Sequence, residues 1–177
     1  LGDVYKRQVF QNADTQLFCG SVEEEIAFGP IQMGLPEAEI RQRTEDCLRL
    51  FGIEKLRERP PYHLSGGEKR KVSLACILSL NPEVLILDEP TRGVDVNAKQ
   101  VIHNVVKDYV SKGNSVILLS SDLPEVVGLA DRAVILREGH TIGMIRKKDM
   151  TENSILIAAN GEGEFCLLYT SPSPRDR

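Results

Sequence analysis

Short apolar runs separated by longer amphipathic stretches set the pattern of this chain. Val84–Leu87 and Ser115–Ser120 consist mainly of Val, Ile and Leu, and Ala133–Leu136 repeats the pattern just before Glu138-Gly139. Strands of a parallel sheet covered on both faces have continuous apolar runs, whereas half-exposed strands alternate apolar and polar positions. The sequence therefore predicts three buried strands between residues 84 and 136.

Helical spacing and capping residues predict helices before and between these runs. Ser21 followed by Glu24 is a capping-box pattern, so a helix should begin there, and Gly29-Pro30 should end it. Gly52 is suited to the left-handed residue that ends a second helix. The predicted helices cover residues 21–29, 36–51, 68–79 and 96–111. Helices that alternate with buried strands indicate an α/β fold with a parallel sheet.

Composition fits one compact domain and excludes several classes of protein. The 177 residues can bury a sizeable core, and the net charge of −4 argues against a nucleic-acid-binding surface. No apolar run is long enough to cross a bilayer, and the N-terminal residues lack the apolar core of a signal peptide. The chain contains Cys19, Cys47, Cys76 and Cys166. Their spacing has no CxxC or Cys/His pattern, which favours reduced, mostly buried thiols over a metal site or disulfides.

Two polar segments on either side of the predicted helix 68–79 carry the candidate chemistry. Leu64–Glu68 can present backbone N–H groups and a Ser hydroxyl at a helix start, which suits a phosphate. The apolar run that begins sixteen residues after Glu68 ends in Asp88 and Glu89, and adjacent carboxylates at a strand end suit Mg²⁺ and an attacking water. Each segment alone also fits an ordinary capped loop or strand end. Their order and spacing together favour nucleotide hydrolysis.

The two segments resemble the signature motif and the Walker B motif of ATP-binding-cassette (ABC) ATPases. The resemblance implies a P-loop NTPase-type ABC nucleotide-binding domain, an α/β fold with a helical subdomain inserted beside the parallel sheet, with ATP and Mg²⁺ bound. It implies that Asp88 orients Mg²⁺ and that Glu89 polarises the attacking water as general base. Val9–Asn12 resembles the Q-loop, which implies that Gln11 reaches both Mg²⁺ and this water.

The resemblance also implies partners. ATP would be sandwiched between two cassettes, with Ser65, Gly66 and Gly67 of the signature on the γ-phosphate that the second cassette holds. Glu68 is a further expected nucleotide-binding residue of this motif. Gly93-Val94-Asp95 resembles the D-loop at the dimer interface, although Asp95 also suits an ordinary N-cap. Residues 12–33 would dock integral membrane subunits, which puts the protein on the cytoplasmic face of the membrane. A capped amphipathic surface helix is equally compatible with these residues.

One position departs from the family pattern. The switch position, usually His before Asp-Leu, holds Ser121 in Ser120–Leu123. A hydroxyl reaches less far than an imidazole, so a catalytically degenerate regulatory cassette is one alternative. Ser121 can also simply end a strand, with Asp122 capping the next helix. A second alternative is a non-transport ABC protein of DNA repair or translation, but repair types insert a coiled coil before the signature, and this interval is short and has no heptads.

Both ends of the chain are expected to be foreign to the gene. Codons for Asp3–Gln8 and for Cys166–Thr170 can be inverted copies of one sequence, as a sequencing adaptor leaves behind, so residues 1–8 and 166–177 receive no functional assignment. The remaining residues form a partial ABC domain. Its expected parts are a helical subdomain over residues 12–80 and part of the catalytic core over residues 81–165. No G-x-x-x-x-G-K-[ST] phosphate loop (Walker A) occurs, so this truncated domain alone is expected to be inactive.

The predicted function is the ATP-hydrolysing subunit of an ABC importer for a metal ion, vitamin or sugar. Residues 9–87 resemble the ATPases of cobalt and energy-coupling-factor importers, notably in Ala27–Pro30. Residues 88–163 are similar to the second cassette of simple-sugar importers, where the switch His is commonly missing. A joining of two sources near Asp88 and a genuine tandem cassette both remain open explanations.

Overall fold

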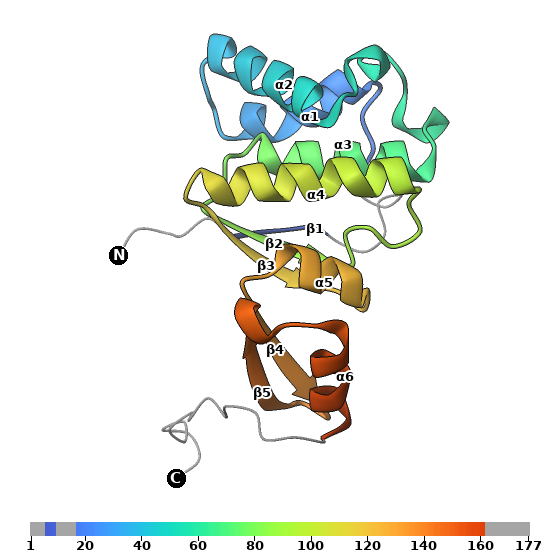
Figure 1. The fold of residues 1–177 in the computed structure, drawn as a ribbon. Helices are drawn as coiled ribbons and strands as arrows, with labels where there is room; N and C mark the ends of the chain where they lie inside the picture. Colours follow the sequence, from blue (N-terminus) through green and yellow to red (C-terminus); the bar gives the residue numbers. More distant parts are fainter. Residues whose placement is uncertain (1–5, 10–16, 162–177) are drawn as a thin grey trace. The chain divides into compact units, whose positions relative to one another are not determined.

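The structure, a computed structural model, describes residues 6–9 and 17–161 (Figure 1). The chain divides into two compact units, residues 1–119 and residues 120–177, and each is described by itself. The first contains a parallel sheet and the helices that cover it, and the second contains an antiparallel hairpin with two helices.

The sheet of the first unit contains β1 (Lys6–Val9), β2 (Val84–Asp88) and β3 (Ser115–Leu119), in the order β1-β2-β3. Both pairs are parallel, with Val9 opposite Leu87 and Asp88 opposite Leu119. Leu85 and Leu87 of the central strand are buried. These features confirm the predicted α/β fold with a parallel sheet.

The prediction of a buried strand at 115–120 is wrong, because β3 contains exposed and half-buried residues but no buried one. The burial of its residues alternates, and Ile117 is 52% exposed. Among the described residues of this unit, β3 pairs only with β2 and is therefore an edge strand. An edge strand is covered less completely than a central one, and the apolar run by itself does not distinguish the two.

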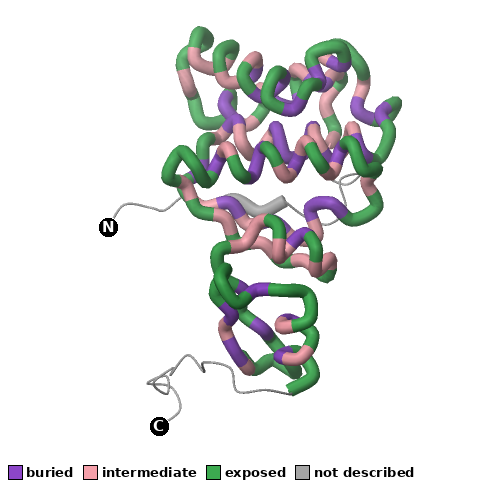
Figure 2. The backbone as a smooth tube through the Cα atoms, in the orientation of Figure 1, coloured by how far each residue is buried: buried purple, intermediate pink, exposed green. Residues whose placement is uncertain are grey.

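Four longer helices belong to the described part of this unit. They are α1 (Val22–Gln32), α2 (Glu37–Phe51), α3 (Gly66–Leu78) and α4 (Val96–Ser111), and the short 3₁₀ turns η2 (Glu54–Leu56) and η3 (Pro61–His63) lie between α2 and α3. In Figure 1, α3 and α4 lie between the sheet and the pair α1 and α2. Figure 2 shows buried positions recurring along α3 and α4, and the fully buried side chains include Ile26, Leu48, Phe51, Val72 and Ile102.

Helix α1 does not end at Gly29-Pro30 as predicted but continues to Gln32, with Pro30 inside it. Proline has no N–H to donate to the carbonyl four residues earlier, which is that of Ile26. The hydroxyl of Ser79, the C-cap residue of α3, lies 3.0 Å from this carbonyl oxygen and donates to it. A tertiary contact therefore supplies the hydrogen bond that the helix itself cannot make.

Three other predicted helix ends agree with the structure, whereas α3 begins two residues before the predicted start at Glu68. Ser21 caps α1 by accepting the N–H of Glu24 at 3.2 Å. Gly52 ends α2 in the left-handed region with φ +62°, and Asp95 caps α4 by accepting the N–H of Ala98 at 2.9 Å. Each of these predictions depended on short-range chemistry between neighbouring residues.

The second unit contains α5 (Leu123–Leu129), β4 (Arg132–Arg137), β5 (His140–Arg146), the turn η4 (Lys147–Asp149) and α6 (Glu152–Asn160). β4 and β5 pair antiparallel around Glu138-Gly139, where both residues have positive φ, as a type I′ turn requires. The prediction of a buried strand at 133–136 is wrong, because Ala133 and Ile135 are buried while Leu136 is 69% exposed. One face of this hairpin packs on α5 and α6, so its residues alternate in burial.

The predicted subdomain 12–80 contains α1, α2 and α3, all between β1 and β2 in sequence. Its boundaries, and the assignment of residues 81–165 to the catalytic core, remain predictions. Strand β1 begins at Lys6, inside the segment 1–8 assigned to an adaptor. That residues 1–8 derive from an adaptor stays a prediction, because a strand can form whatever the origin of its codons. The same prediction for residues 166–177 falls outside the described residues.

Candidate functional site

The start of α3 is an exposed helix N-terminus with a complete capping box. The backbone N–H of Ser65 donates to the Glu68 carboxylate at 2.8 Å, and the N–H of Glu68 donates to Ser65 Oγ at 3.3 Å. The bond from the Ser65 backbone N–H, and after it a bond at 2.8 Å from the Ser65 hydroxyl to the same carboxylate, hold the pKa of Glu68 below its usual range. Ser65 and Gly66 are exposed. An open helix start with a hydroxyl beside it can accept a phosphate group.

Gly67 brings the start of α3 against the start of α4. A Cβ atom at Gly67 would lie 2.7 Å from Oδ2 of Asp95 and 3.2 Å from Cβ of Ala98. Asp95 is held there by its capping bond to Ala98, and the same bond lowers the pKa of the Asp95 carboxyl. The predicted signature and D-loop residues are therefore direct neighbours within one chain.

The two candidate catalytic carboxylates follow the central strand. Asp88 is the last residue of β2, and Glu89 comes next with φ +46°, in the left-handed region. The N–H of Glu89 donates to the carbonyl of Leu119 at 2.8 Å. A non-glycine residue in this region costs about 1–3 kcal/mol and persists only where its surroundings hold it, often at functional sites.

Arg70 of α3 is a residue of this site that the sequence analysis missed. Its side chain is 3% exposed. Nε donates to the carbonyl of Pro90 at 2.8 Å, and Nη2 donates to the carbonyls of Asp88 and Glu89, each at 2.9 Å. The sequence did contain a signal for it: Arg70 lies four positions before Leu74, so it falls on the buried face of the helix, where a charged side chain needs a partner.

Two further predicted catalytic residues lie outside the described part of the first unit. Gln11 lies outside the described residues. Ser121 belongs to the second unit and is exposed. Beside it, Asp122 caps α5 by accepting the N–H of Glu125 at 3.0 Å, and Ser120 Oγ donates to the buried Glu125 carboxylate at 2.6 Å. The strand-end and N-cap interpretation thus fits the local geometry, and a switch role for Ser121 stays a proposal.

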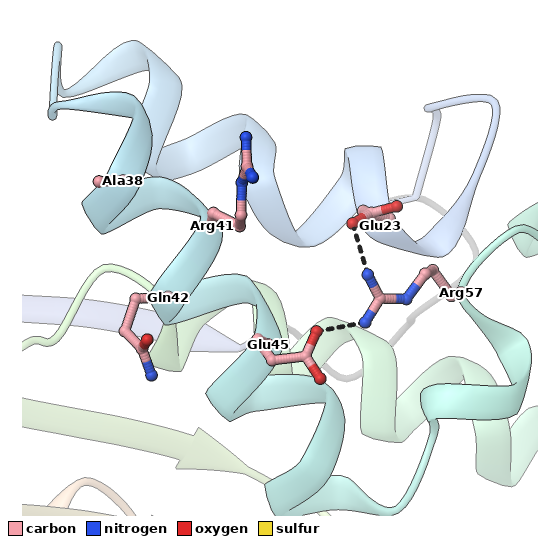
Figure 3. Close-up of a pocket in the computed structure, with 6 residues that line it drawn as sticks. All are labelled: Glu23, Ala38, Arg41, Gln42, Glu45 and Arg57. Carbon is pink, nitrogen blue, oxygen red and sulfur yellow. Dashed lines mark hydrogen bonds and ion pairs between the residues drawn. The ribbon is translucent and has the colours of Figure 1, made fainter.

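A surface pocket of about 550 Å³ lies on α1, α2 and the chain after η2, away from these motif residues (Figure 3). Arg57 there donates to Glu23 at 2.9 Å and also to Glu45, and hydrogen bonds from Arg57 and then Arg49 lower the pKa of Glu45. Arg41 pairs with Glu37 at 2.9 Å. Because both arginines that line the pocket are paired with carboxylates, the pocket is poorly suited to an anionic nucleotide.

The burial of the three described cysteines agrees only in part with the sequence analysis. Cys19, Cys47 and Cys76 are free thiols. Cys47 is buried, which raises the pKa of its thiol to about 12, whereas Cys19 and Cys76 are half-buried. Cys166 lies outside the described residues. Within the described ranges, no group of three or more His, Cys, Asp or Glu could hold a metal ion.

Comparison with known proteins gives the family. The family model described as "ABC transporter" matches residues 5–92. Together with the parallel sheet and the motif geometry, this match shows that these residues form part of an ABC transporter ATP-binding domain. None of the helices in the described ranges has the length and apolar composition needed to cross a bilayer.

Three relatives illustrate the match. The nickel import ATP-binding protein LarO of Lactiplantibacillus plantarum is 44% identical over 134 residues, which is 76% of this chain and 56% of LarO. The energy-coupling factor transporter ATP-binding protein EcfA of Methanoculleus marisnigri is 44% identical over 139 residues, 76% of this chain and 49% of EcfA. The structure of CbiO1 from Clostridium perfringens, part of the ABC transporter complex CbiONQ, superposes with a TM-score of 0.76 at 35% identity and covers 86% of this chain and 61% of CbiO1. The chain thus spans less than two thirds of each relative.

Proposed function

We propose that the complete protein is the ATP-binding and ATP-hydrolysing subunit of an ABC importer. The observation that carries this proposal is the arrangement around α3. Its N-terminus, at Ser65 and Gly66, is open for a phosphate. One turn further along the same helix, Arg70 contacts the turn that presents Asp88 and Glu89. The helix thereby connects a candidate phosphate site to the turn that carries the two candidate carboxylates.

The proposed reaction transfers the γ-phosphoryl group of ATP to water, releasing ADP and inorganic phosphate. Glu89 accepts a proton from the water as the water attacks phosphorus, and Gln11 helps to orient that water. Asp88 fits the Mg²⁺ that accompanies the nucleotide, since Mg²⁺ is usually held by one or two carboxylates together with substrate phosphates. When bound, the ion neutralises charge on the phosphate oxygens.

A second cassette is part of the proposal. A helix N-terminus offers N–H groups and a positive dipole end to an anion, but it lacks the lysine and glycine loop that hold the β- and γ-phosphates. Ser65, Gly66 and Gly67 are therefore assigned to the nucleotide of the neighbouring cassette, with Glu68 fixing the loop and Asp95 near the interface. On this assignment, the 177-residue chain by itself has no measurable ATP turnover.

The segment after the predicted Q-loop is the proposed docking surface for integral membrane subunits. Phe18 is 68% exposed, and its ring packs edge-on against Phe28 with 5.0 Å between centroids. The buried carboxylate of Glu25 accepts the N–H groups of Phe18 and Cys19 at 2.8 and 2.6 Å. A fixed, exposed aromatic pair suits contact with an apolar partner surface. This supports docking through residues 12–33 and a peripheral position on the cytoplasmic face of the membrane.

The transported solute is proposed only by class. The relatives include a nickel import protein and an energy-coupling factor protein, which favours a metal ion or vitamin. A sugar remains the alternative suggested by residues 88–163. The helices before the signature have 11 and 15 residues, which does not favour the coiled-coil insertion of repair-type ABC proteins.

A catalytically degenerate regulatory cassette is the second candidate, because Ser121 occupies the switch position. ATPase assays on the full-length protein, recovered by amplifying source DNA from upstream of Leu1 across the Pro90 codon, separate the two. Turnover that depends on Mg²⁺ and on Glu89 supports the enzyme. Tight ATP binding without turnover in any pairing of cassettes supports the regulatory module instead.

A further inference from the structure

We infer that Arg70 is a positioning residue that ties the signature helix to the backbone of the general base. The inference rests on the proposed function, because it assigns Arg70 an effect on the reaction through Glu89. The guanidinium group donates to three successive carbonyls, those of Asp88, Glu89 and Pro90. It thus holds the whole turn that follows the central strand.

The position of this turn in the sheet explains why it needs such a contact. The ladder between β2 and β3 ends at the pair Asp88 and Leu119, and the N–H of Glu89 makes one further bond to the Leu119 carbonyl. Beyond that point the strand gives way to a turn, where carbonyl groups need other partners. A buried guanidinium supplies charged donors in a planar fork, and such hydrogen bonds are stronger than those between neutral groups.

The conformation of Glu89 makes the contact relevant to chemistry. Its φ of +46° is unfavourable for a residue with a side chain. Its N–H is bonded to β3 and its carbonyl to Arg70, so both ends of the residue are fixed. The direction of a side chain follows from the backbone at its Cα atom. Arg70 therefore helps to determine where the Glu89 carboxylate points.

The location of Arg70 on α3 links the start of this helix to the turn that carries Asp88 and Glu89. The helix begins with the exposed residues Ser65 and Gly66, proposed to meet the neighbouring cassette's nucleotide, and Arg70 lies in its second turn. A shift of the helix start moves the guanidinium relative to the turn of Asp88 to Pro90. Nucleotide binding at the neighbouring cassette's site thereby changes the position of Glu89, the general base of this chain's own site.

The first test measures the turn itself and needs no turnover. Arg70→Met in the full-length protein keeps the apolar stem and removes the donors, and Arg70→Lys keeps the charge without the fork. We expect faster amide hydrogen exchange in peptides covering residues 88–92, with unchanged exchange in α2, in both variants. Exchange at 88–92 that equals that of the unsubstituted protein, or a uniform increase over the whole first unit, overturns the inference.

The second test is a double-mutant cycle with Glu89→Gln. Misplacing a catalytic group by about 1 Å can cost on the order of 10²-fold in rate, so Arg70→Met should lower kcat by about 10–100-fold while KM for ATP changes less than about 2-fold. In the Glu89→Gln background the same substitution should have almost no further effect, because the group that it misplaces is gone. The control is Arg41→Met, an exposed arginine on α2 paired with Glu37, which should leave kcat unchanged.

The outcomes separate this inference from the proposed function. A full loss in Arg70→Met that persists undiminished in the Glu89→Gln background contradicts positioning through Glu89, as does an unchanged kcat in Arg70→Met alone. Absence of turnover in the unsubstituted full-length protein contradicts the proposed function. In that case the exchange measurement still decides whether Arg70 holds the turn.

Discussion

Gly67 and Asp95 are so close that a Cβ atom on Gly67 would lie 2.7 Å from the Asp95 carboxylate oxygen. The neighbouring Gly66 differs, because nothing lies within 4 Å of a Cβ atom built there. Neither glycine has a positive φ. The two positions of the signature therefore favour glycine for different reasons. At Gly67 a side chain would collide with Asp95 of this chain, whereas at Gly66 the absence of a side chain leaves the exposed surface open.

The two glycines give a matched pair of substitutions. Gly67→Ala should destabilise the protein by about 1–3 kcal/mol, the usual cost of overpacking, because Asp95 cannot move without losing its cap bond to Ala98. Gly66→Ala should change the free energy of unfolding by less than about 0.5 kcal/mol. Denaturant unfolding monitored by circular dichroism measures both. Equal effects at the two positions would contradict the packing argument.

The hydroxyl of Ser79 is expected to matter because of Pro30. Ser79→Ala should cost about 1–3 kcal/mol, since it leaves a buried carbonyl at Ile26 without its donor. Pro30→Ala restores an N–H that can bond this carbonyl within α1. In that background the cost of Ser79→Ala should fall by about half or more. A cost that stays the same in both backgrounds would mean that the Ile26 carbonyl has little part in the role of Ser79.

The capping box at α3 predicts a pH dependence. The Ser65 bonds lower the pKa of Glu68 in the folded state, so their contribution to stability is complete above the ordinary glutamate pKa of about 4.3 and is lost as the pH falls through the lower folded value. Glu68→Gln can still form the box but does not titrate. The unsubstituted protein should be more stable than Glu68→Gln by about 0.3–1 kcal/mol at pH 6, and this difference should shrink toward pH 3. A difference independent of pH would contradict the assignment.

Ser121→His tests the departure from the family pattern. A hydrogen bond from a charged imidazole to the γ-phosphate, worth about 1.5 kcal/mol, would raise turnover by about 10-fold. Single-turnover hydrolysis with the partner cassette inactivated measures this site alone. An unchanged rate would mean that the cassette works without a switch histidine or is degenerate for other reasons, and that Ser121 only precedes the Asp122 cap.

The sequence was sufficient for features that depend on neighbouring residues. Ser65, Asp95 and Gly52 were predicted as helix ends because a cap is completed within three or four positions. The exposed face of β3, the continuation of α1 through Pro30 and the contact of Arg70 depend on segments that meet only in the fold. The motif at 64–68 indicated a phosphate site, but no pattern indicated that a residue two positions later would bind the turn after Glu89.

The most direct test of the whole account is ATP hydrolysis by the full-length protein and its Glu89→Gln variant, each assembled with an active second cassette. We expect Mg²⁺-dependent turnover in the unsubstituted protein. In Glu89→Gln we expect unchanged ATP affinity and a rate lower by about 10²–10⁴-fold. Normal hydrolysis by Glu89→Gln would contradict the assignment of Glu89 as the base and would mean that the turn after β2 has only a structural role.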